Sequence, residues 1–147
     1  MAVLDTEAYL DAVCEMIAAG KQNVPVPIRG VSMRPFLRSG DQAYLSPLQP
    51  KIRKGDILLF QRENSQYVLH RVYRIRRDGT CLLLGDSQLQ PEPVTREQFR
   101  AQVSFVRCGT RDFRPGSFRW WFFAGPWRRL APWRRQIGKI LALFRKK

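Results

Sequence analysis

Hydrophobic and polar residues change their spacing along the chain, and the first pattern is helical. Apolar residues recur every three or four positions over residues 5–19, which predicts an amphipathic helix. Thr6 or Asp5 would cap its start and Gly20 would end it. The apolar face consists of Tyr9, Leu10, Val13, Met16 and Ile17.

From Val24 to Val106 the pattern changes to short apolar runs separated by turn residues. The sequence Asp78-Gly79 is a hairpin signal, and Thr95–Gln98 has the residues of a capping box, which predicts one helical turn before the last strand. Short strands at this spacing predict a mainly β fold, antiparallel and partly closed. The expected strands are Gln42–Leu45, Ile57–Gln61, Tyr67–Ile75, Cys81–Leu84 and Val103–Val106.

The C-terminal part of the chain is rich in aromatic and basic residues. Between Phe118 and Trp133, Pro126 and Pro132 interrupt any long helix. Over the last fifteen residues, apolar positions recur at helical spacing and basic residues fall largely on the other side. This pattern predicts a basic amphipathic helix at the C-terminus.

Composition locates the charge of the chain. Its 147 residues include 26 Lys or Arg and 12 Asp or Glu, which gives a formal net charge of +14. Ten basic residues and no acidic residue lie within 113–147, so subtracting ten from 26 leaves 16 basic and 12 acidic residues within 1–112. The sequence therefore divides into a β domain with its N-terminal helix over 1–112 and a basic tail over 113–147. A hydrophobic content of 44% excludes a wholly disordered chain.

Cysteine usage and the N-terminal residues bear on cofactors and location. Three cysteines lie far apart without a C-x-x-C pair, so the sequence suggests neither a zinc site nor a disulfide framework, and no cofactor is expected. Acidic residues stand where a secretory signal would need a basic start and an apolar run. The sequence contains no run of 18 apolar residues, so a membrane-spanning helix is not predicted. We expect a cytoplasmic protein with reduced thiols.

Three residues are candidates for catalytic chemistry. Ser32 lies in a turn between Gly30 and Pro35, where a nucleophile would be accessible, but a serine hydroxyl needs a base to take its proton. His70 is the only histidine and lies on an expected strand. Asp86 follows a glycine in a turn and could orient the imidazole. Taken alone, each also fits a purely structural role, as a turn serine, a structural histidine or a turn aspartate.

Four sequence blocks, taken in order, make a catalytic role more convincing. They are Gly30-Val31-Ser32-Met33-Arg34-Pro35-Phe36-Leu37, Lys54–Phe60, Val68–Val72 and Leu84–Ser87. The chain resembles the signal peptidase I superfamily, the S24/S26 serine peptidases, which also contains the self-cleaving SOS repressor. It is most similar to the histidine-type branch, because His70 stands where the bacterial housekeeping enzymes have a lysine base. The resemblance implies a coiled antiparallel β-structure, with Ser32 as nucleophile, His70 as general base and Asp86 as the supporting carboxylate.

The resemblance also suggests how substrate is held. Gly30 stands where some relatives place a serine hydroxyl, so backbone N–H groups around Ser32 would bind the oxyanion. Met33 would lie beneath the substrate groove, although a simple core role is an equal alternative. The implied function is a serine endopeptidase that cleaves an extended peptide or precursor protein through an acyl-enzyme. The alternative is a non-catalytic adaptor on the same fold, binding a membrane or nucleic acid.

Two departures from the family concern location and substrate. Signal peptidases carry a spanning helix, whereas this chain opens with an acidic amphipathic helix, so its active site is expected to stay in the cytoplasm. The spacing from Ser32 to His70 is also compact, so the chain resembles the short stand-alone bacterial forms, whose substrates the resemblance does not identify. The tail fits the headgroup layer of an anionic membrane, on the inner face of the plasma membrane. Nucleic acid and the protein's own core are the alternative partners of the tail. The residues expected to bind the membrane are Trp120, Trp121, Trp127, Trp133, Ile137, Ile140, Leu141 and Phe144.

Overall fold

The computed structural model describes residues 2–145, with side chains from residue 7 onward. The main helices are α1 (Ala2–Ala18), α2 (Phe118–Phe122) and α3 (Arg134–Arg145). The strands are β1 (Val24–Pro27), β2 (Gln42–Ser46), β3 (Ile57–Gln61), β4 (Tyr67–Ile75), β5 (Cys81–Leu84), β6 (Glu92–Val94), β7 (Phe99–Cys108) and β8 (Arg111–Phe113). Short helical turns occupy Arg96–Gln98, Phe123–Trp127 and Ala131–Trp133.

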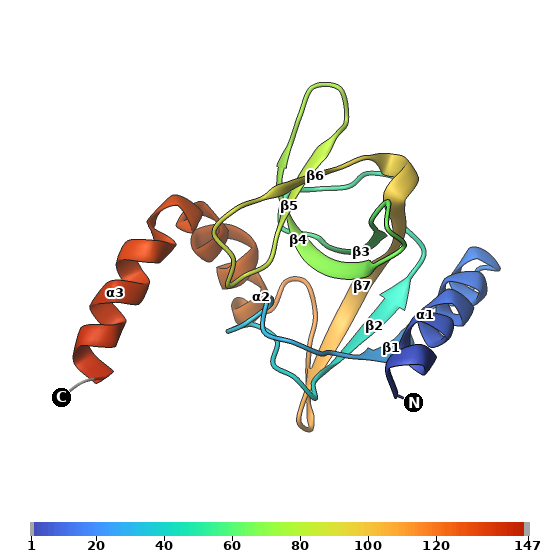
Figure 1. The fold of residues 1–147 in the computed structure, drawn as a ribbon, viewed down its shortest axis with the longest axis horizontal. Helices are drawn as coiled ribbons and strands as arrows, with labels where there is room; N and C mark the ends of the chain where they lie inside the picture. Colours follow the sequence, from blue (N-terminus) through green and yellow to red (C-terminus); the bar gives the residue numbers. More distant parts are fainter. Residues whose placement is uncertain (1, 146–147) are drawn as a thin grey trace.

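The strands form one antiparallel sheet in the order β1-β2-β7-β3-β4-β5-β6, with β8 also paired to β7. Register shifts interrupt the β2–β7, β3–β7 and β4–β5 ladders. Such bulges bend a strand and increase its twist, and Figure 1 shows the sheet coiling so that β3 to β6 curl over its centre. The expected mainly β fold with a helix at each end is confirmed.

The coiled sheet encloses two hydrophobic clusters that share β3. Ile57 and Leu59 belong to the cluster that includes α1, β1 and β2, whereas Leu58 and Phe60 belong to the cluster of β5 and β6. Successive side chains of a strand point to opposite faces, so β3 is buried on both sides. This explains why its sequence is a continuous apolar run instead of an alternating one.

Most elements expected from the sequence are confirmed, and three short strands are new. The helix expected over 5–19 is α1, but it begins at Ala2, so Asp5 and Thr6 lie within the helix and the expectation that one of them caps it is wrong. The five expected strands are β2 to β5 and β7, and the capping-box turn precedes β7, with the Thr95 N–H donating to Gln98 Oε1 at 2.9 Å. The hairpin loop spans residues 77–79, because the Arg76 N–H bonds the Thr80 carbonyl. The sequence pattern missed β1, β6 and β8, of which β1 contains two prolines. Proline is confined to edge strands because it lacks a donor, and β1 is an edge strand.

The basic tail is partly packed and partly extended. Trp120 is 5% exposed and meets the Phe36 ring edge-on at 5.4 Å. The helix expected at the C-terminus is α3, which begins at Arg134 and extends away from the sheet (Figure 1); residues 146–147 of that expectation lie outside the described residues. The division of the chain at residue 112 stays a prediction.

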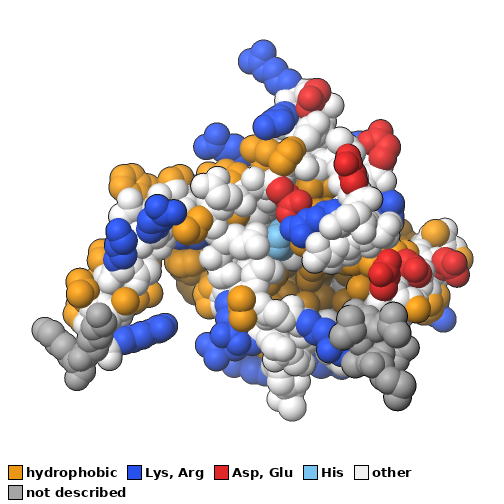
Figure 2. All heavy atoms as spheres, in the orientation of Figure 1, with side chains coloured by type: hydrophobic (Ala, Val, Ile, Leu, Met, Phe, Trp, Pro, Cys, Tyr) orange, Lys and Arg blue, Asp and Glu red, His pale blue; other side chains and the backbone are white. Residues whose placement is uncertain are grey.

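Charge is distributed unevenly over the surface. In the face seen in Figure 2, acidic side chains lie near α1 and over the upper part of the sheet, and basic and apolar side chains lie together along the arm that α3 forms. Among the helices that the structure describes, none is long and apolar enough to cross a membrane.

Candidate active site

The candidate nucleophile Ser32 lies in a turn that follows β1. The Ile28 N–H donates to the Asp41 carbonyl at 2.7 Å, which extends the β1 pairing toward the turn. Gly30 then adopts a φ of +82°, a conformation that side chains rarely adopt. The turn is anchored in the core by Phe36 and Leu37, both 0% exposed. Ser32 itself remains half-buried, so the fold holds its backbone while leaving its side chain at the surface of a cavity.

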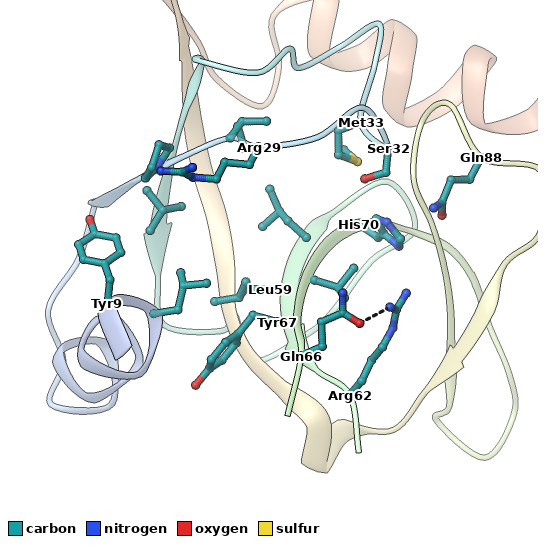
Figure 3. Close-up of a pocket in the computed structure, with 16 residues that line it drawn as sticks. Tyr9, Arg29, Ser32, Met33, Leu59, Arg62, Gln66, Tyr67, His70 and Gln88 are labelled. Carbon is teal, nitrogen blue, oxygen red and sulfur yellow. Dashed lines mark hydrogen bonds between the residues drawn. The ribbon is translucent and has the colours of Figure 1, made fainter. Parts of the chain in front are cut away.

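That cavity measures about 780 Å³ and lies between β1, β4 and α1. Figure 3 shows Ser32, Met33 and His70 together at one end of it, and Tyr9 and Tyr67 at the other. Its apolar lining includes Leu10, Val26, Ile28, Leu59, Val68 and Leu69, and its polar lining includes Arg29, Arg62, Gln66 and Gln88. The structure thus brings together the serine and the histidine that the sequence singled out, although they are 38 residues apart.

His70 lies on β4 and is almost completely buried. Its side chain is 2% exposed, and this burial lowers the imidazole pKa to about 4; Glu92 acts in the opposite direction and Arg62 adds to the lowering. The imidazole is therefore neutral near pH 7 and free to accept a proton. Its Nδ1 atom is buried without a hydrogen-bond partner, 4.0 Å from Oε1 of Glu92.

Glu92, at the start of β6, is the carboxylate that the structure places near the imidazole. Arg62 binds both of its oxygens, at 2.6 and 3.1 Å. A proton on Nδ1 directed at Glu92 would leave Nε2 as the acceptor nitrogen. Sequence reasoning missed this residue because β6 was not expected, and only the pairing of β5 with both β4 and β6 places Glu92 near His70.

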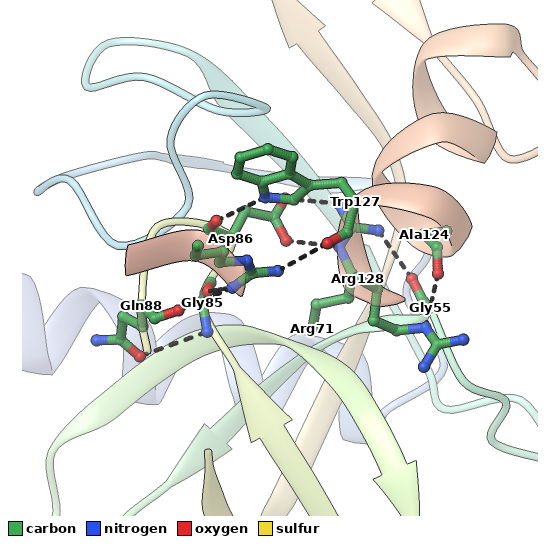
Figure 4. A network of polar contacts seen from close by, with 9 residues as sticks. Gly55, Arg71, Gly85, Asp86, Gln88, Ala124, Trp127 and Arg128 are labelled. Carbon is green, nitrogen blue, oxygen red and sulfur yellow. Dashed lines mark hydrogen bonds and ion pairs between the residues drawn. The ribbon is translucent and has the colours of Figure 1, made fainter. Parts of the chain in front are cut away.

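Asp86 has a different position from the one expected. Its oxygens accept hydrogen bonds from Nε and Nη2 of Arg71 at 2.8 and 2.9 Å, and both side chains are 1% exposed (Figure 4). Arg71 follows His70 on β4, and neighbouring strand residues point to opposite faces. We therefore correct the expectation that Asp86 supports the imidazole: its carboxylate is paired with Arg71 behind the site.

The turn Gly85–Gln88 lies directly against the backbone of Ser32. The Ser87 N–H donates to the Ser32 carbonyl at 2.9 Å, and Ser87 Oγ donates to the Val31 carbonyl at 2.7 Å. A Cβ on Gly85 would lie 2.4 Å from the Ser32 carbonyl oxygen, which is far inside van der Waals contact. Gly85 is therefore required for this close approach. The sequence motif Gly85-Asp86 indicated a turn but not its contact with the Ser32 backbone.

The expected oxyanion and substrate residues surround the serine. Within residues 2–145, the N–H groups of Ser32 and Met33 donate to no protein acceptor. A Cβ at Gly30 would meet nothing within 4 Å, so the space beside the backbone is open there. Met33 is 3% exposed and yet lines the cavity, so it is both a core residue and part of the cavity wall.

Two unpaired strand edges border the cavity. Val72 exchanges backbone hydrogen bonds with the segment before β3, so by alternation the backbone groups of Tyr67 and Leu69 point to the opposite edge of β4. The pairing of β5 with β4 starts only at Arg71, which leaves those groups unpaired by any strand. On the facing side, β1 pairs with β2 alone. By alternation the outward-facing residues of β1 are Pro25 and Pro27, which lack an N–H donor, and the Pro25 carbonyl accepts a hydrogen bond from the Tyr9 hydroxyl at 2.8 Å. The edge of β4 is therefore the one that offers both donors and acceptors to an extended chain.

The residues expected to bind a membrane differ in their exposure. Trp120 packs in the core, and the indole N–H of Trp127 donates to the Asp86 carbonyl at 2.7 Å. We correct the expectation for these two, because both serve contacts inside the protein. Ile137 is half-buried. The exposed members are Trp121 (56%), Trp133 (60%), Ile140 (53%), Leu141 (52%) and Phe144 (71%).

Comparison with known proteins gives one match. A family model described as "Peptidase S24-like" matches residues 1–106. The matched range contains Ser32, His70, Asp86 and Glu92, and it ends before the basic tail. No curated protein and no solved structure matches the chain.

Replacing Gly85 by alanine tests the close approach to Ser32. The added Cβ would force the Ser32 backbone away, so we expect Gly85→Ala to lower the free energy of unfolding by about 1–3 kcal/mol. Gly138 in α3 has no atom within 4 Å of its Cβ position, and Gly138→Ala should raise it by up to about 1 kcal/mol. Urea unfolding measures both. Equal effects of the two substitutions would show that the approach is not tight.

The low pKa of His70 predicts a specific dependence of stability on pH. The unfolded chain binds a proton near pH 6.5, whereas the folded protein binds it only near pH 4. Between these values the unfolded state holds more protons, so the free energy of unfolding should fall as the pH falls from about 6.5 to about 4. In His70→Gln this loss should be smaller. Parallel pH profiles for the two proteins, measured by urea unfolding, would contradict a buried neutral imidazole.

Proposed function

The chain belongs to the Peptidase S24-like family, and on this premise we propose that it is a serine endopeptidase with Ser32 as nucleophile and His70 as general base. The observation that carries the proposal is the meeting of Ser32 and a buried neutral His70 at one end of a cavity bordered by two unpaired strand edges. A purely structural histidine would have no need of a serine and an open cavity beside it.

The proposed reaction proceeds in two halves. His70 takes the proton of the Ser32 hydroxyl while Oγ attacks the scissile carbonyl, and the negative charge moves to the carbonyl oxygen. The free N–H groups of Ser32 and Met33 would donate to that oxygen. The tetrahedral intermediate collapses as His70 returns its proton to the leaving amine, which leaves an acyl-enzyme. A water molecule activated by His70 then releases the acyl group and regenerates the hydroxyl.

Glu92 is the carboxylate that we assign to the imidazole. During each half-reaction His70 becomes positively charged in a buried position, which costs free energy unless a negative charge faces it. Glu92 already lies 4.0 Å from Nδ1, and a small closure would convert this distance to a hydrogen bond. Arg62 holds the carboxylate in place through two contacts.

The proposed substrate is an extended peptide or precursor segment. Its backbone would pair with the open edge of β4 at Tyr67 and Leu69, as a strand added to a sheet. The cavity between the edges is largely apolar, which favours uncharged side chains near the cut. The family resemblance adds that those nearest Ser32 are small.

We further propose that the protein works at an anionic membrane surface, as a peripheral protein on its cytoplasmic side. The far part of α3 exposes Ile140, Leu141, Leu143 and Phe144 beside basic residues. A helix of this kind lies in the headgroup layer with its apolar side inward. Each basic residue near such a surface contributes about 1 kcal/mol.

Covalent labelling tests the catalytic assignment. We expect a fluorophosphonate probe to label the wild-type protein and not Ser32→Ala, and to label His70→Ala at least about 100-fold more slowly. Glu92→Gln should slow labelling about tenfold or more, because the imidazole loses its orienting charge.

The matched controls are Ser39→Ala and Glu97→Gln, which alter exposed residues outside the cavity and should label like the wild type. Mass spectrometry locates the modified residue. Labelling at a residue other than Ser32, or none in any protein, would favour a non-catalytic adaptor on the same fold.

Vesicle binding tests the membrane assignment. We expect binding to vesicles that contain phosphatidylglycerol and little to phosphatidylcholine alone, with a loss of at least about tenfold in the double variant Ile140→Glu/Phe144→Glu. The control Ile75→Glu alters an apolar side chain of similar exposure on β4 and should bind as the wild type does. If the protein bound an oligonucleotide tightly and ignored anionic vesicles at the same salt concentration, nucleic acid would be the partner.

A further inference from the structure

One buried and one half-buried side chain of the tail contact the turn Gly85–Gln88 from behind. Arg134 is 7% exposed, and its Nη1 donates to the carbonyls of Gly85 and Gln88 at 3.0 and 2.8 Å. Trp127 donates its indole N–H to the carbonyl of Asp86 at 2.7 Å. Three of the four carbonyls in this turn therefore accept hydrogen bonds from the tail, and Figure 4 shows Trp127 lying over the turn.

The opposite side of the same turn holds the candidate nucleophile. Ser87 donates its N–H to the carbonyl of Ser32, and no Cβ would fit between Gly85 and that carbonyl. The turn therefore packs between the tail and the Ser32 backbone. Because the turn is hydrogen-bonded to Ser32 and in close contact with it, we expect a displacement of the turn to move Ser32.

Trp127 and Arg134 also support one another. The Arg134 guanidinium lies 5.3 Å from the centre of the Trp127 ring, and its Nη2 donates to the Trp127 carbonyl at 3.4 Å. Nearby, Arg128 donates to the Tyr73 carbonyl at 2.9 Å, which ties the same part of the tail to β4. A Cβ on Gly55 would meet the Ala124 Cβ at 2.8 Å, so the tail packs closely here as well.

The burial of Arg134 indicates what this arrangement is for. A buried guanidinium costs free energy unless its donors are satisfied, and a tail that served only as a membrane anchor would need no buried arginine. Nη1 and Nη2 of Arg134 meet backbone carbonyls of the turn and of Trp127, whereas Nε is buried without a hydrogen-bond partner. The tail lies beyond residue 106, where the family match ends, so the family comparison assigns it no part in the site.

We propose that the tail is a positioning part of the site: Trp127 and Arg134 fix the turn Gly85–Gln88, and the turn fixes the backbone of Ser32. Neither residue lines the cavity, so both act through the turn. The effect on the turn stands on the contacts alone, whereas its effect on turnover rests on the proposed function. Arg134 is also the first residue of α3, so one residue joins the exposed helix to the turn.

The first test measures the turn itself, without turnover. The variants are Trp127→Phe, which keeps an aromatic ring and removes the donor, and Arg134→Met, which keeps an unbranched chain and removes the guanidinium. Trp133→Phe and Arg135→Met are the matched controls, because both residues are exposed neighbours. We expect amide exchange of Ser87, measured by NMR on the full chain, to be at least about tenfold faster in the variants and within about twofold of wild type in the controls.

The second test measures peptide turnover in the same proteins, at a temperature where all remain folded. A misplaced nucleophile lowers kcat, so we expect a loss of about 10- to 100-fold in kcat with KM within about twofold. The acid limb of the pH profile should stay in place, because Glu92 and Arg62, the charged groups that act on His70, do not belong to the tail. A smaller folded fraction would also leave the KM and the pH limb unchanged. It is recognised because the loss of kcat would then scale with the unfolded fraction measured by circular dichroism.

These two measurements separate the inference from the proposed function. Unchanged exchange of Ser87 in both variants overturns the inference, whatever the activity. Faster exchange with an unlabelled, inactive wild type would leave the positioning of Ser32 standing and overturn the peptidase proposal. Faster exchange together with a kcat that follows only the folded fraction would show that the tail does not position Ser32 for catalysis.

Discussion

The buried ion pair between Arg71 and Asp86 is the interaction on which the rest of the site depends. Removing two charges from water costs several kcal/mol for each ion, and the pair repays this only when its remaining donors and acceptors are satisfied. Here both carboxylate oxygens are bound, and Nη1 of Arg71 donates to the Gly55 carbonyl at 2.9 Å. The guanidinium also lies 4.9 Å from the centre of the Phe36 ring. The pair thus joins β4, the turn after β5, the segment before β3 and the nucleophile loop.

Strand alternation lets one strand serve both faces of this arrangement. His70 points into the cavity, and Arg71, the next residue, points behind it to Asp86. Any slip of β4 by one residue would exchange the two faces and place the arginine in the cavity. The ion pair therefore fixes the register that presents the imidazole. Asp86 is paired with Arg71 on the face of β4 opposite His70, which is why we assign the supporting role to Glu92 instead.

The sequence predicted the parts of the site that local patterns encode. Ser32 between Gly30 and Pro35 and a lone His70 on a strand were recognisable, and the ordered blocks implied that they meet. The sequence could not show which carboxylate, Asp86 or Glu92, lies near His70. The answer depends on the sheet pairing, in which Arg71 pairs with Asp86 and leaves Glu92 near the imidazole. Asp86 follows a glycine and suggests a functional turn, whereas Glu92 precedes a proline in a three-residue strand that has no clear pattern.

In the tail, the sequence likewise could not show which basic and aromatic residues are exposed and which contact the rest of the protein. Ten basic residues and four tryptophans in one segment suggested an address for a membrane, yet Arg119, Arg128 and Arg134 donate to backbone carbonyls of the β domain or its loops. Trp120 and Trp127 are likewise committed to internal contacts. Spacing along the chain cannot separate the two most buried of these residues from their neighbours, because each is adjacent to an exposed residue of the same type: Trp120 to Trp121, and Arg134 to Arg135. The surface that a membrane would meet is consequently smaller than the composition suggests, and it is concentrated on α3.

The pKa of His70 sets a further constraint on the proposed chemistry. A base with a pKa near 4 is fully neutral at pH 7, but it is a weaker base than free imidazole, so taking the Ser32 proton would be less favourable. The deficit comes from burial, and Glu92 offsets only part of it, because Arg62 neutralises that carboxylate. Arg62 is in turn bonded to Gln66 at 2.8 Å, beside the open edge of β4. Both Arg62 and Gln66 line the cavity, and Arg62 lowers the pKa of His70, so the position of this one guanidinium affects how strong a base the imidazole is.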